Sequence, residues 1–436
     1  EAFSTCPNLV MESLPEQVVE IGAKAFYMNT AMTRFSVPTS VTRIGEAAFG
    51  LTTSLEEISI PFVGGHVYSS NFKSLEDQRT RYAHDSRESL FGYIFGSEGN
   101  NLTTITRQVY NDEQFETLNN NPNTLNGVEV FYVPNSLKQI NLTSSIGIGY
   151  GAFMNLIHIE RITLPLELKF IGKYAFYGDW GLGGVDIPRG VEIIGEGAFA
   201  NSGIEYIEIW NKVVSPGEFE NCKRLHTAIL HDTVEEIGQG AFTGCSLLEN
   251  LVIPFVGQKN YDNDRTSGYN TSFMWLFGMD VNANLTSFEH HCPNASENAN
   301  VFKIEATTRE VELTKFTHIL QTTESGDIEG LLPNSLTNLT IYNQIRFATG
   351  SMMNVAHKLN PNDFHPQLTT VYTNEASEQI SKINLYFKNE ETCNDLLEFG
   401  PHSFEAANSF DEITIRSSVN VINSYAFSNI DALTLV

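Results

Sequence analysis

Two short clusters in this chain hold side chains that could bind a metal ion. The triplet His-His-Cys at 290–292 is the densest set of soft ligands, and the triplet Asp-Asn-Asp at 262–264 offers oxygen ligands. A zinc site needs a second pair of ligands at matching spacing, and none accompanies the first triplet. The second triplet lacks the Asp-x-Asp-x-Asp-Gly order and the closing Glu of a calcium loop. We therefore expect polar loops at both places, with no metal site and no cofactor.

A third cluster, formed by His357, Asp363 and His365, has the residue types of a hydrolase centre. Such a centre also needs an activated nucleophile, and no motif such as G-x-S-x-G accompanies these residues. The sequence therefore predicts that the protein is not an enzyme.

The elements that would have to position any site come from a repeat, because phenylalanine returns every 23 residues over much of the chain. An Ile-Gly pair usually stands five and four residues before this Phe, and an Ala usually stands directly before it. The recurring residues are Phe3, Phe26, Phe49, Phe153, Phe176, Phe199, Phe219, Phe242, Phe404 and Phe427. Fixed apolar positions at a period of about 20 to 50 residues are typical of a solenoid, in which each coil buries its apolar face against a neighbour.

Each repeat has the parts of one coil. After Phe49, the apolar residues Leu55, Ile58 and Ile60 alternate as in a half-buried strand, and Pro61 then ends the strand. A second apolar pair predicts a short second strand. The residue two places after the Phe is Asn or Gly, both of which tolerate the left-handed backbone that ends a helical turn. These residues are Asn155, Gly178, Asn201, Asn221, Gly244 and Asn429. We expect one helical turn around each Ala-Phe pair and a column of stacked Phe rings inside the solenoid.

This unit resembles the BspA-type leucine-rich repeat, as the segments IGEAAFGLTTSLEEISIP at 44–61 and IGQGAFTGCSLLENLVIP at 237–254 show well. The resemblance implies a leucine-rich-repeat solenoid that is mostly β, with short helical turns. Members of that family are typically extracellular, on bacterial or protist cell surfaces, and some adhere to host matrix. No catalytic residue is implied.

A larger period lies over the first, because the segments IPFVG and PNSL each occur twice, about 190 to 200 residues apart. A polar stretch and an aromatic Phe-Gly segment follow each IPFVG. We interpret these stretches as two inserts in one continuous elongated array, part of a longer chain. The expected order is coils at 1–61, insert 1 at 62–133, coils at 134–254, insert 2 at 255–332, degenerate coils at 333–398 and coils at 399–436. Met352 takes the place of a repeat Phe.

The five cysteines fit this organisation better than a disulfide framework. Cys6, Cys222 and Cys245 each follow a repeat Phe by three residues, so we expect small buried apolar side chains there. Cys222 and Cys245 should point the same way from adjacent coils, which disfavours a disulfide. Cys292 and Cys393 have no partner visible in the sequence.

Charge and hydropathy exclude some classes of partner. The formal net charge is −26, so the chain should be repelled by nucleic acids and by anionic lipid surfaces. No run of 18 apolar residues occurs, which predicts no membrane insertion by this segment. We expect an extracellular or cell-surface location, with a host or other extracellular protein or a glycan as partner.

The two inserts are the expected place of recognition, because binding usually resides on additions that project from a rigid scaffold. Tyr68, Tyr82, Tyr261 and Tyr269 lie in their polar stretches and are the candidate binding residues. The expected function is non-catalytic recognition or adhesion. The alternatives are a passive structural stalk or surface-layer component and, more remotely, an enzyme or metal site within the inserts.

Overall fold

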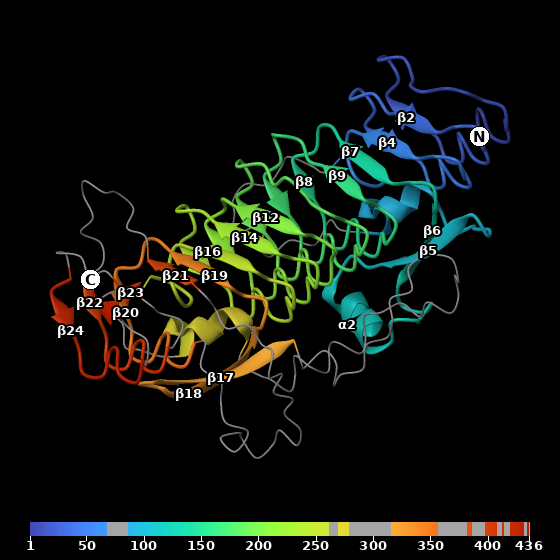
Figure 1. Ribbon diagram of the computed structural model, residues 1–436. Helices are drawn as coiled ribbons and strands as arrows, with labels where there is room; N and C mark the ends of the chain where they lie inside the picture. Colours follow the sequence, from blue (N-terminus) through green and yellow to red (C-terminus); the bar gives the residue numbers. More distant parts are fainter. Residues whose placement is uncertain are drawn as a thin grey trace. The chain divides into compact units, whose positions relative to one another are not determined.

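The computed structural model describes residues 1–67, 86–260, 269–278, 315–355, 382–385, 397–407, 412–413, 419–430 and 434–435 (Figure 1). The chain divides into two compact units, Glu1–Ile204 and Glu205–Val436. Each unit is described separately below.

A parallel sheet of four strands runs along the first unit in the order β2-β4-β7-β9. Its strands are β2 (Arg34–Ser36), β4 (Glu57–Ile60), β7 (Gln139–Leu142) and β9 (Arg161–Thr163). The inward side chains Phe35, Ile58, Ile140 and Ile162 are buried. β4 pairs directly with β7 although 78 residues separate them, residues 61–138. The intervening segment therefore leaves the sheet uninterrupted.

The second unit repeats this arrangement with five parallel strands in the order β12-β14-β16-β19-β21 (Figure 1). Its strands are β12 (Tyr206–Ile209), β14 (Thr227–Leu230), β16 (Asn250–Ile253), β19 (Asn338–Ile341) and β21 (Lys382–Leu385). β16 pairs directly with β19, as β4 does with β7.

Two-residue strands form separate parallel ladders in both units. Those of the first unit are β1 (Glu20–Ile21), β3 (Arg43–Ile44), β8 (Gly147–Ile148), β10 (Phe170–Ile171) and β11 (Ile193–Ile194). Those of the second are β13 (Val213–Val214), β15 (Glu236–Ile237), β20 (Arg346–Phe347), β22 (Glu398–Phe399), β23 (Glu412–Ile413), β24 (Val421–Ile422) and β25 (Thr434–Leu435). Paired residues in successive coils, such as Glu20 and Arg43, are 23 positions apart.

Stacked turns that carry the Ala-Phe pairs form the third side of each coil. The backbone N–H of Phe26 donates to the carbonyl of Ala48 in the next coil at 2.7 Å. The rings stack as expected, with centroids 5.4 Å apart for Phe26 and Phe49 and 5.0 Å apart for Phe176 and Phe199. The column of stacked turns joined by these hydrogen bonds is the turn ladder. Met352 occupies a Phe position in the turn ladder, since its N–H donates to the carbonyl of Ser403. This placement of Met352 is confirmed.

The expected left-handed residues after each Phe are confirmed, with φ between 57° and 74° at Asn155, Gly178, Asn201, Asn221, Gly244 and Asn429. A second left-handed residue, two positions before the Phe, was not expected. It is glycine in several coils, but it is Lys24 (φ 54°), Tyr174 (φ 53°) and Tyr425 (φ 58°) in others. With both positions left-handed, the segment is a run of hydrogen-bonded turns rather than a regular helical turn.

Left-handed residues that are not glycine lower the stability of these turns. Met28 has φ 60° and is 41% exposed, so it loses little burial when its side chain is removed. Met28→Gly should raise the free energy of unfolding by about 1 kcal/mol, because an L-residue in this conformation costs about 1–2 kcal/mol. Leu166 is exposed and is not left-handed, so Leu166→Gly should leave stability unchanged or lower it. Urea unfolding checks both; equal effects of the two variants would contradict the account.

Each unit carries an added module that packs on the turns. In the first unit it comprises η2 (Arg87–Ser89), η3 (Phe91–Ile94), β5 (Thr103–Gln108), α2 (Asp112–Asn120) and β6 (Glu129–Pro134), with β5 and β6 antiparallel. In the second it comprises η4 (Tyr269–Thr271), η5 (Phe273–Phe277) and the antiparallel pair β17 (Phe316–Thr323) and β18 (Gly326–Pro333). β18 packs against η5.

The aromatic 3-10 helices η3 and η5 each take the place of one turn in the turn ladder. Phe49 N–H donates to the carbonyl of Ile94, and Phe91 N–H donates to that of Ala152. In the second unit Phe242 N–H donates to the carbonyl of Leu276 in the same way. Nine of the described rings in the two inserts are buried: Phe62, Phe91, Tyr93, Phe95, Phe131, Phe255, Phe273, Phe277 and Phe316. These rings therefore belong to the core and are not binding residues.

One buried glutamine attaches each module to the coils. Gln108 is fully buried; its Oε1 accepts from Gly92 N–H at 2.8 Å, and its Nε2 donates to the carbonyls of Ala152 and Met154. Gln321 makes the equivalent bonds to Met274 and Met353 in the second unit. The antiparallel hairpin of each module is thereby held both to η3 or η5 and to the next coil.

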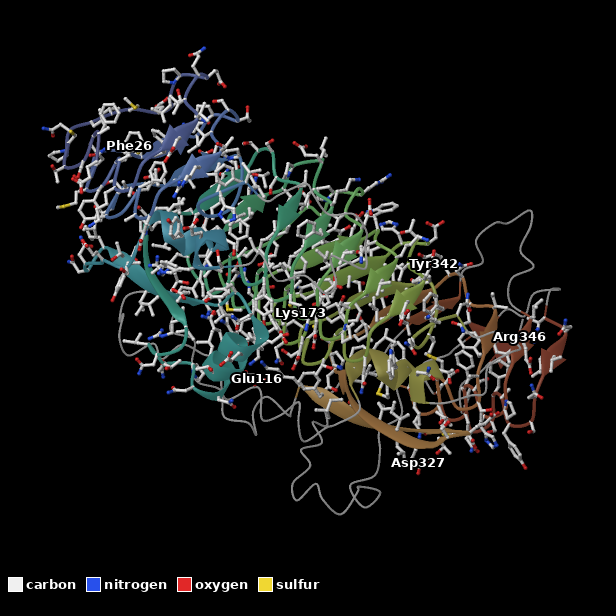
Figure 2. All side chains as sticks on the ribbon, turned by 180° about the vertical axis from the view of Figure 1, so that it is seen from behind. Phe26, Glu116, Lys173, Asp327, Tyr342 and Arg346 are labelled. Atoms are coloured by element: carbon white, nitrogen blue, oxygen red, sulfur yellow. The ribbon has the colours of Figure 1, made fainter. Side chains whose placement is uncertain are left out.

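The helix α2 adds a second cluster to the first module. Its residue Phe115 stacks on Tyr174 with centroids 3.6 Å apart, and both join an apolar cluster with Val109, Leu118 and Tyr150. Lys173, labelled in Figure 2 together with Glu116 of α2, forms ion pairs with Asp112 and Glu196. The left-handed conformation of Tyr174 is thus accompanied by extensive packing of its ring.

The cysteines behave as expected with one exception. Cys222 and Cys245 are buried and form no disulfide, whereas Cys292 and Cys393 lie outside the described residues. Cys6 is exposed, so the expectation that it is buried is wrong. Its backbone N–H donates to the side chain of Asn29 in the next coil, while its thiol is not enclosed by that coil.

Candidate functional site

The strand sheets present outward-facing side chains in straight rows, because paired residues of parallel strands stand side by side. In the first unit these rows are polar. Asn141 Nδ2 donates to Glu57 Oε1 at 2.8 Å and to Ser59 Oγ at 3.2 Å, and Thr163 Oγ1 donates to Asn141 Oδ1. The side chains of the row therefore form hydrogen bonds with one another. This face is a self-paired polar surface.

In the second unit, aromatic side chains directly follow three of the strands, whereas Pro254 follows β16. Other coils have proline there, for example Pro61 after β4, whereas the second unit has Trp210 after β12, His231 after β14 and Tyr342 after β19. Tyr342, the residue after β19, is labelled in Figure 2. The three rings stand in one row, with Pro254 between His231 and Tyr342, because the strands that precede them are aligned.

These rings and two residues of β12 are together called the aromatic–acidic cluster: Tyr206, Glu208, Trp210, His231 and Tyr342. Tyr206 Oη donates to Glu208 Oε1, and His231 Nε2 lies 3.1 Å from Glu208 Oε2. The rings of Trp210 and His231 stack with centroids 3.3 Å apart at 11°. Tyr342 Oη donates to the carbonyl of Leu230, the residue before His231, at 2.7 Å.

The cluster combines apolar surface with a retained negative charge. Tyr206 is 45% exposed, and the side chain of Glu208 is 40% exposed. Hydrogen bonds from Tyr206 first and from His231 second lower the pKa of Glu208 below its usual range, so the carboxylate stays ionised. Burial raises the pKa of Tyr342, which therefore remains a neutral hydrogen-bond donor. Aromatic faces beside an exposed carboxylate can bind a partner without any chemical step.

The four binding residues expected from the sequence are not among the residues of this cluster. Tyr68, Tyr82 and Tyr261 lie outside the described residues. Tyr269 is the first residue of η4, and only its backbone is described. The four residues therefore remain a prediction.

Sequence reasoning missed the aromatic–acidic cluster although a signal was present. The residue that closes the strand is proline in five coils: Pro38, Pro61, Pro165, Pro188 and Pro254. Its replacement by Trp210, His231 and Tyr342 within one run of coils marks a surface that the solenoid itself does not require.

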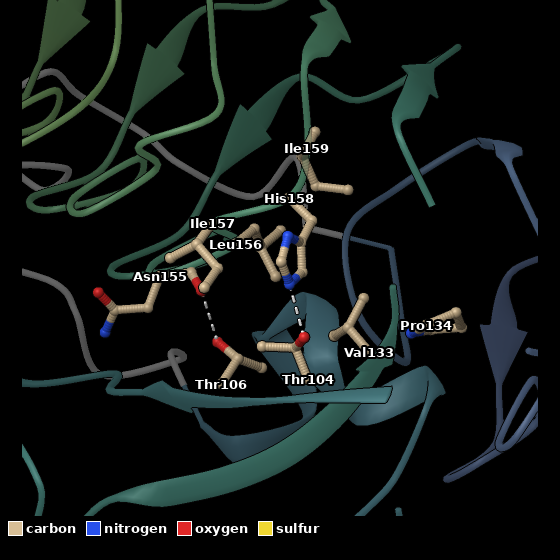
Figure 3. Close-up of a pocket in the computed structure, with 9 residues that line it drawn as sticks. All are labelled: Thr104, Thr106, Val133, Pro134, Asn155, Leu156, Ile157, His158 and Ile159. Atoms are coloured by element: carbon tan, nitrogen blue, oxygen red, sulfur yellow. Dashed lines mark hydrogen bonds between the residues drawn. The ribbon is translucent and has the colours of Figure 1, made fainter. Parts of the chain in front are cut away.

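A small cavity lies where the hairpin β5–β6 meets the next coil of the first unit (Figure 3). Its volume of about 10 Å³ has room for about one water molecule. His158 lines it and is paired with Thr104 Oγ1 at 2.6 Å, while Thr106 Oγ1 donates to the carbonyl of Asn155 (Figure 3). The cavity is a packing feature between hairpin and coil and is too small for an organic ligand.

Acidification should loosen this contact. Burial, with a smaller effect of Lys138, lowers the pKa of His158 to about 4. The unfolded chain binds a proton below about pH 6.5, whereas the folded chain does not until about pH 4, so stability falls as the pH drops through this window. The loss between pH 7 and pH 5 should be about 2 kcal/mol. His158→Gln should remove this dependence; an unchanged pH profile in urea unfolding would contradict the assignment.

The clusters with metal-binding or hydrolase residue types stay sequence-based expectations. Those at 262–264, 290–292 and around His357 and His365 lie outside the described residues. Within the described ranges, no group of three or more His, Cys, Asp or Glu is arranged to hold a metal ion. In the same part of the chain, no helix is both long and apolar enough to cross a membrane.

Three solved structures similar to this chain are leucine-rich-repeat proteins of low sequence identity. A leucine-rich repeat protein of T. pallidum is 22% identical, with a TM-score of 0.27 over 54% of this chain and 76% of its own. A leucine rich cell surface protein of Faecalibacterium prausnitzii is 15% identical, with a TM-score of 0.25 over 97% of this chain and 80% of its own. A Bacteroides ovatus leucine-rich repeat protein is 18% identical, with a TM-score of 0.25 over 58% of this chain and 68% of its own. No curated protein matches the chain.

The sequence profile of the BspA type leucine rich repeat region matches in six copies. The matched residues are 1–98, 103–223, 146–265, 212–319 and 332–434. The match covers well over half of the sequence, and the described coils are mostly β. The chain is a leucine-rich-repeat solenoid and belongs to the BspA-type leucine-rich repeat family.

Proposed function

We propose that this protein is a non-catalytic recognition scaffold, located at the cell surface or secreted, that binds extracellular protein or glycan partners. The single observation that supports the proposal most strongly is the aromatic–acidic cluster on the strand face of the second unit. Its rings replace the proline of other coils, where a solenoid has no structural need for large aromatic side chains. Membership of the BspA-type leucine-rich repeat family supports the location.

The distribution of the added modules also favours the strand face. Both modules pack on the turns, through η3, η5 and the buried glutamines Gln108 and Gln321. In the described part of the chain, the outward side chains of β12, β14, β16 and β19 are half-buried or exposed. In this part of the chain, the strand face of the second unit is therefore a rigid surface with partly exposed aromatic side chains, among them Tyr206.

A binding screen against immobilised matrix proteins and glycans tests the proposal. The intact chain should capture at least one partner, and the double variant Tyr206→Ala with Trp210→Ala should lose most of that capture. Large rigid side chains at the centre of an interface typically contribute about 2 kcal/mol or more each. Circular dichroism confirms that the variant is folded.

A second variant tests the insert tyrosines in parallel, with Tyr68, Tyr82, Tyr261 and Tyr269 all replaced by alanine. Point substitutions are needed because deleting a whole module would remove η3 or η5 from the turn ladder. Loss of capture only in this variant would move recognition to the inserts. No capture by the intact chain would favour a passive structural stalk.

A further inference from the structure

The strand face beside the aromatic–acidic cluster contains apolar side chains that indicate the class of ligand. Ile229 of β14 and Val252 of β16 face outward in the same cross-strand row as Glu208. Both side chains are half-buried. Branched aliphatic groups contact the apolar side chains of a polypeptide, and they offer no hydrogen bonds to the hydroxyl groups of a sugar.

The polar residues next to this row are already paired with one another. Asn338 Nδ2 donates to Asn250 Oδ1 at 2.9 Å, and Asn250 Nδ2 donates to Thr227 Oγ1 at 3.3 Å. A glycan would need such amides to bind its hydroxyls, and here they bind along the row instead. The row therefore favours a ligand recognised by apolar contact and charge.

The negative charge of the cluster and of the whole chain indicates which kind of polypeptide would bind. The carboxylate of Glu208 is exposed at the edge of Tyr206 and of the stacked pair Trp210–His231. Over the whole chain the formal net charge is −26, which attracts cationic ligands and repels anionic glycans. An aromatic face attracts a cation in addition to the pairing of that cation with a carboxylate.

We propose that the aromatic–acidic cluster binds a polypeptide segment that presents a lysine or arginine next to apolar side chains. The cationic head pairs with Glu208, and its aliphatic stem lies along Tyr206. The flanking apolar side chains of the segment contact Ile229 and Val252. This inference rests on the proposed recognition function and names the chemistry of its partner.

Fluorescence anisotropy with the full chain tests the inference. The probe is a short fluorescein-labelled peptide of alternating leucine and lysine, compared with the same peptide carrying glutamine in place of lysine. The lysine peptide should bind at least about tenfold more tightly than the glutamine peptide, and Glu208→Gln should weaken its binding by about tenfold. Trp210→Leu should weaken both peptides.

Glu57→Gln provides the matched control, because Glu57 is an outward glutamate on β4 that belongs to the polar row of the first unit. It should change the affinity for the lysine peptide by less than about twofold. Equal losses in Glu57→Gln and Glu208→Gln would overturn the inference in favour of diffuse attraction by net charge. Competition by an uncharged oligosaccharide of N-acetylglucosamine would overturn it in favour of a glycan site.

The screen of immobilised partners separates the two proposals. If a partner is captured through Tyr206 and Trp210 while the lysine peptide does not bind, the recognition function stands and the cationic ligand is wrong. If the chain captures no partner and binds no peptide, both are wrong.

Discussion

Gln108→Leu should lower the free energy of unfolding of the first unit by about 3 kcal/mol. Leucine fills a similar volume but cannot accept from Gly92 N–H or donate to the carbonyls of Ala152 and Met154. The substitution leaves the buried Gly92 N–H without a partner, which costs about 1–3 kcal/mol. It also removes a second bond from each carbonyl; among the described residues, these otherwise accept only from Phe91 N–H and Thr106 Oγ1, respectively. Urea unfolding with hydrogen exchange over residues 86–134 measures the loss and should show earlier exchange in the module.

Two further substitutions make the prediction specific. Gln321→Leu should have a similar effect in the second unit, because Gln321 makes the equivalent bonds to Met274 and Met353. Gln139→Leu is the control, since Gln139 faces outward on β7 and its side-chain amide donates to the side chain of Asn141 on the same face. A loss of stability as large in Gln139→Leu as in Gln108→Leu would show that the buried bonds do not hold the module.

Asp179→Asn should stabilise the first unit by about 3 kcal/mol at pH 8, which is the scale of burying a polar group without full pairing. Asp179 is fully buried; its Oδ1 accepts from Leu156 N–H, and its Oδ2 has no hydrogen-bond partner among the described residues. Burial raises the pKa of this carboxyl well above its usual range. Asn29 occupies the same position after Phe26 and accepts from Cys6 N–H, so an asparagine fits this place.

The sign of the pH dependence follows from the raised pKa. The folded chain keeps the proton of Asp179, whereas the unfolded chain releases it above about pH 4, so stability falls as the pH rises beyond that value. The advantage of Asp179→Asn should therefore be small at pH 3.5 or below and grow towards pH 8. Asp186→Asn is the exposed control and should change little. A stabilisation that is the same at acid and alkaline pH would contradict a protonated Asp179.

Much of the coil can be predicted from the sequence because its constraints are local and repeated. The Phe positions predict the stacked rings, and the alternation at Ile58 and Ile60 predicts the inward face of β4. Asn155 and its equivalents predict left-handed backbone, because Asn tolerates that conformation better than most residues.

Other features depend on contacts between distant segments and have no local signature. Tyr174 adopts a left-handed conformation that its residue type disfavours, and its ring packs against Phe115 from the added module. Likewise η3 enters the turn ladder between Phe49 and Ala152, a position that no spacing in the sequence indicates. The aromatic–acidic cluster lies between these cases: the change from Pro61 to Trp210 at the strand end is visible, but the pairing of Glu208 with His231 requires the fold.

Hydroxyl-radical footprinting of the chain with a captured partner tests the central claim most directly, because it reports the solvent exposure of individual aromatic side chains. Recognition through the strand face predicts reduced oxidation of Tyr206 and Trp210 in the complex, with unchanged oxidation of Tyr68, Tyr82 and Tyr261. Protection of those three tyrosines with no change at Tyr206 and Trp210 would contradict the account and place recognition in the inserts.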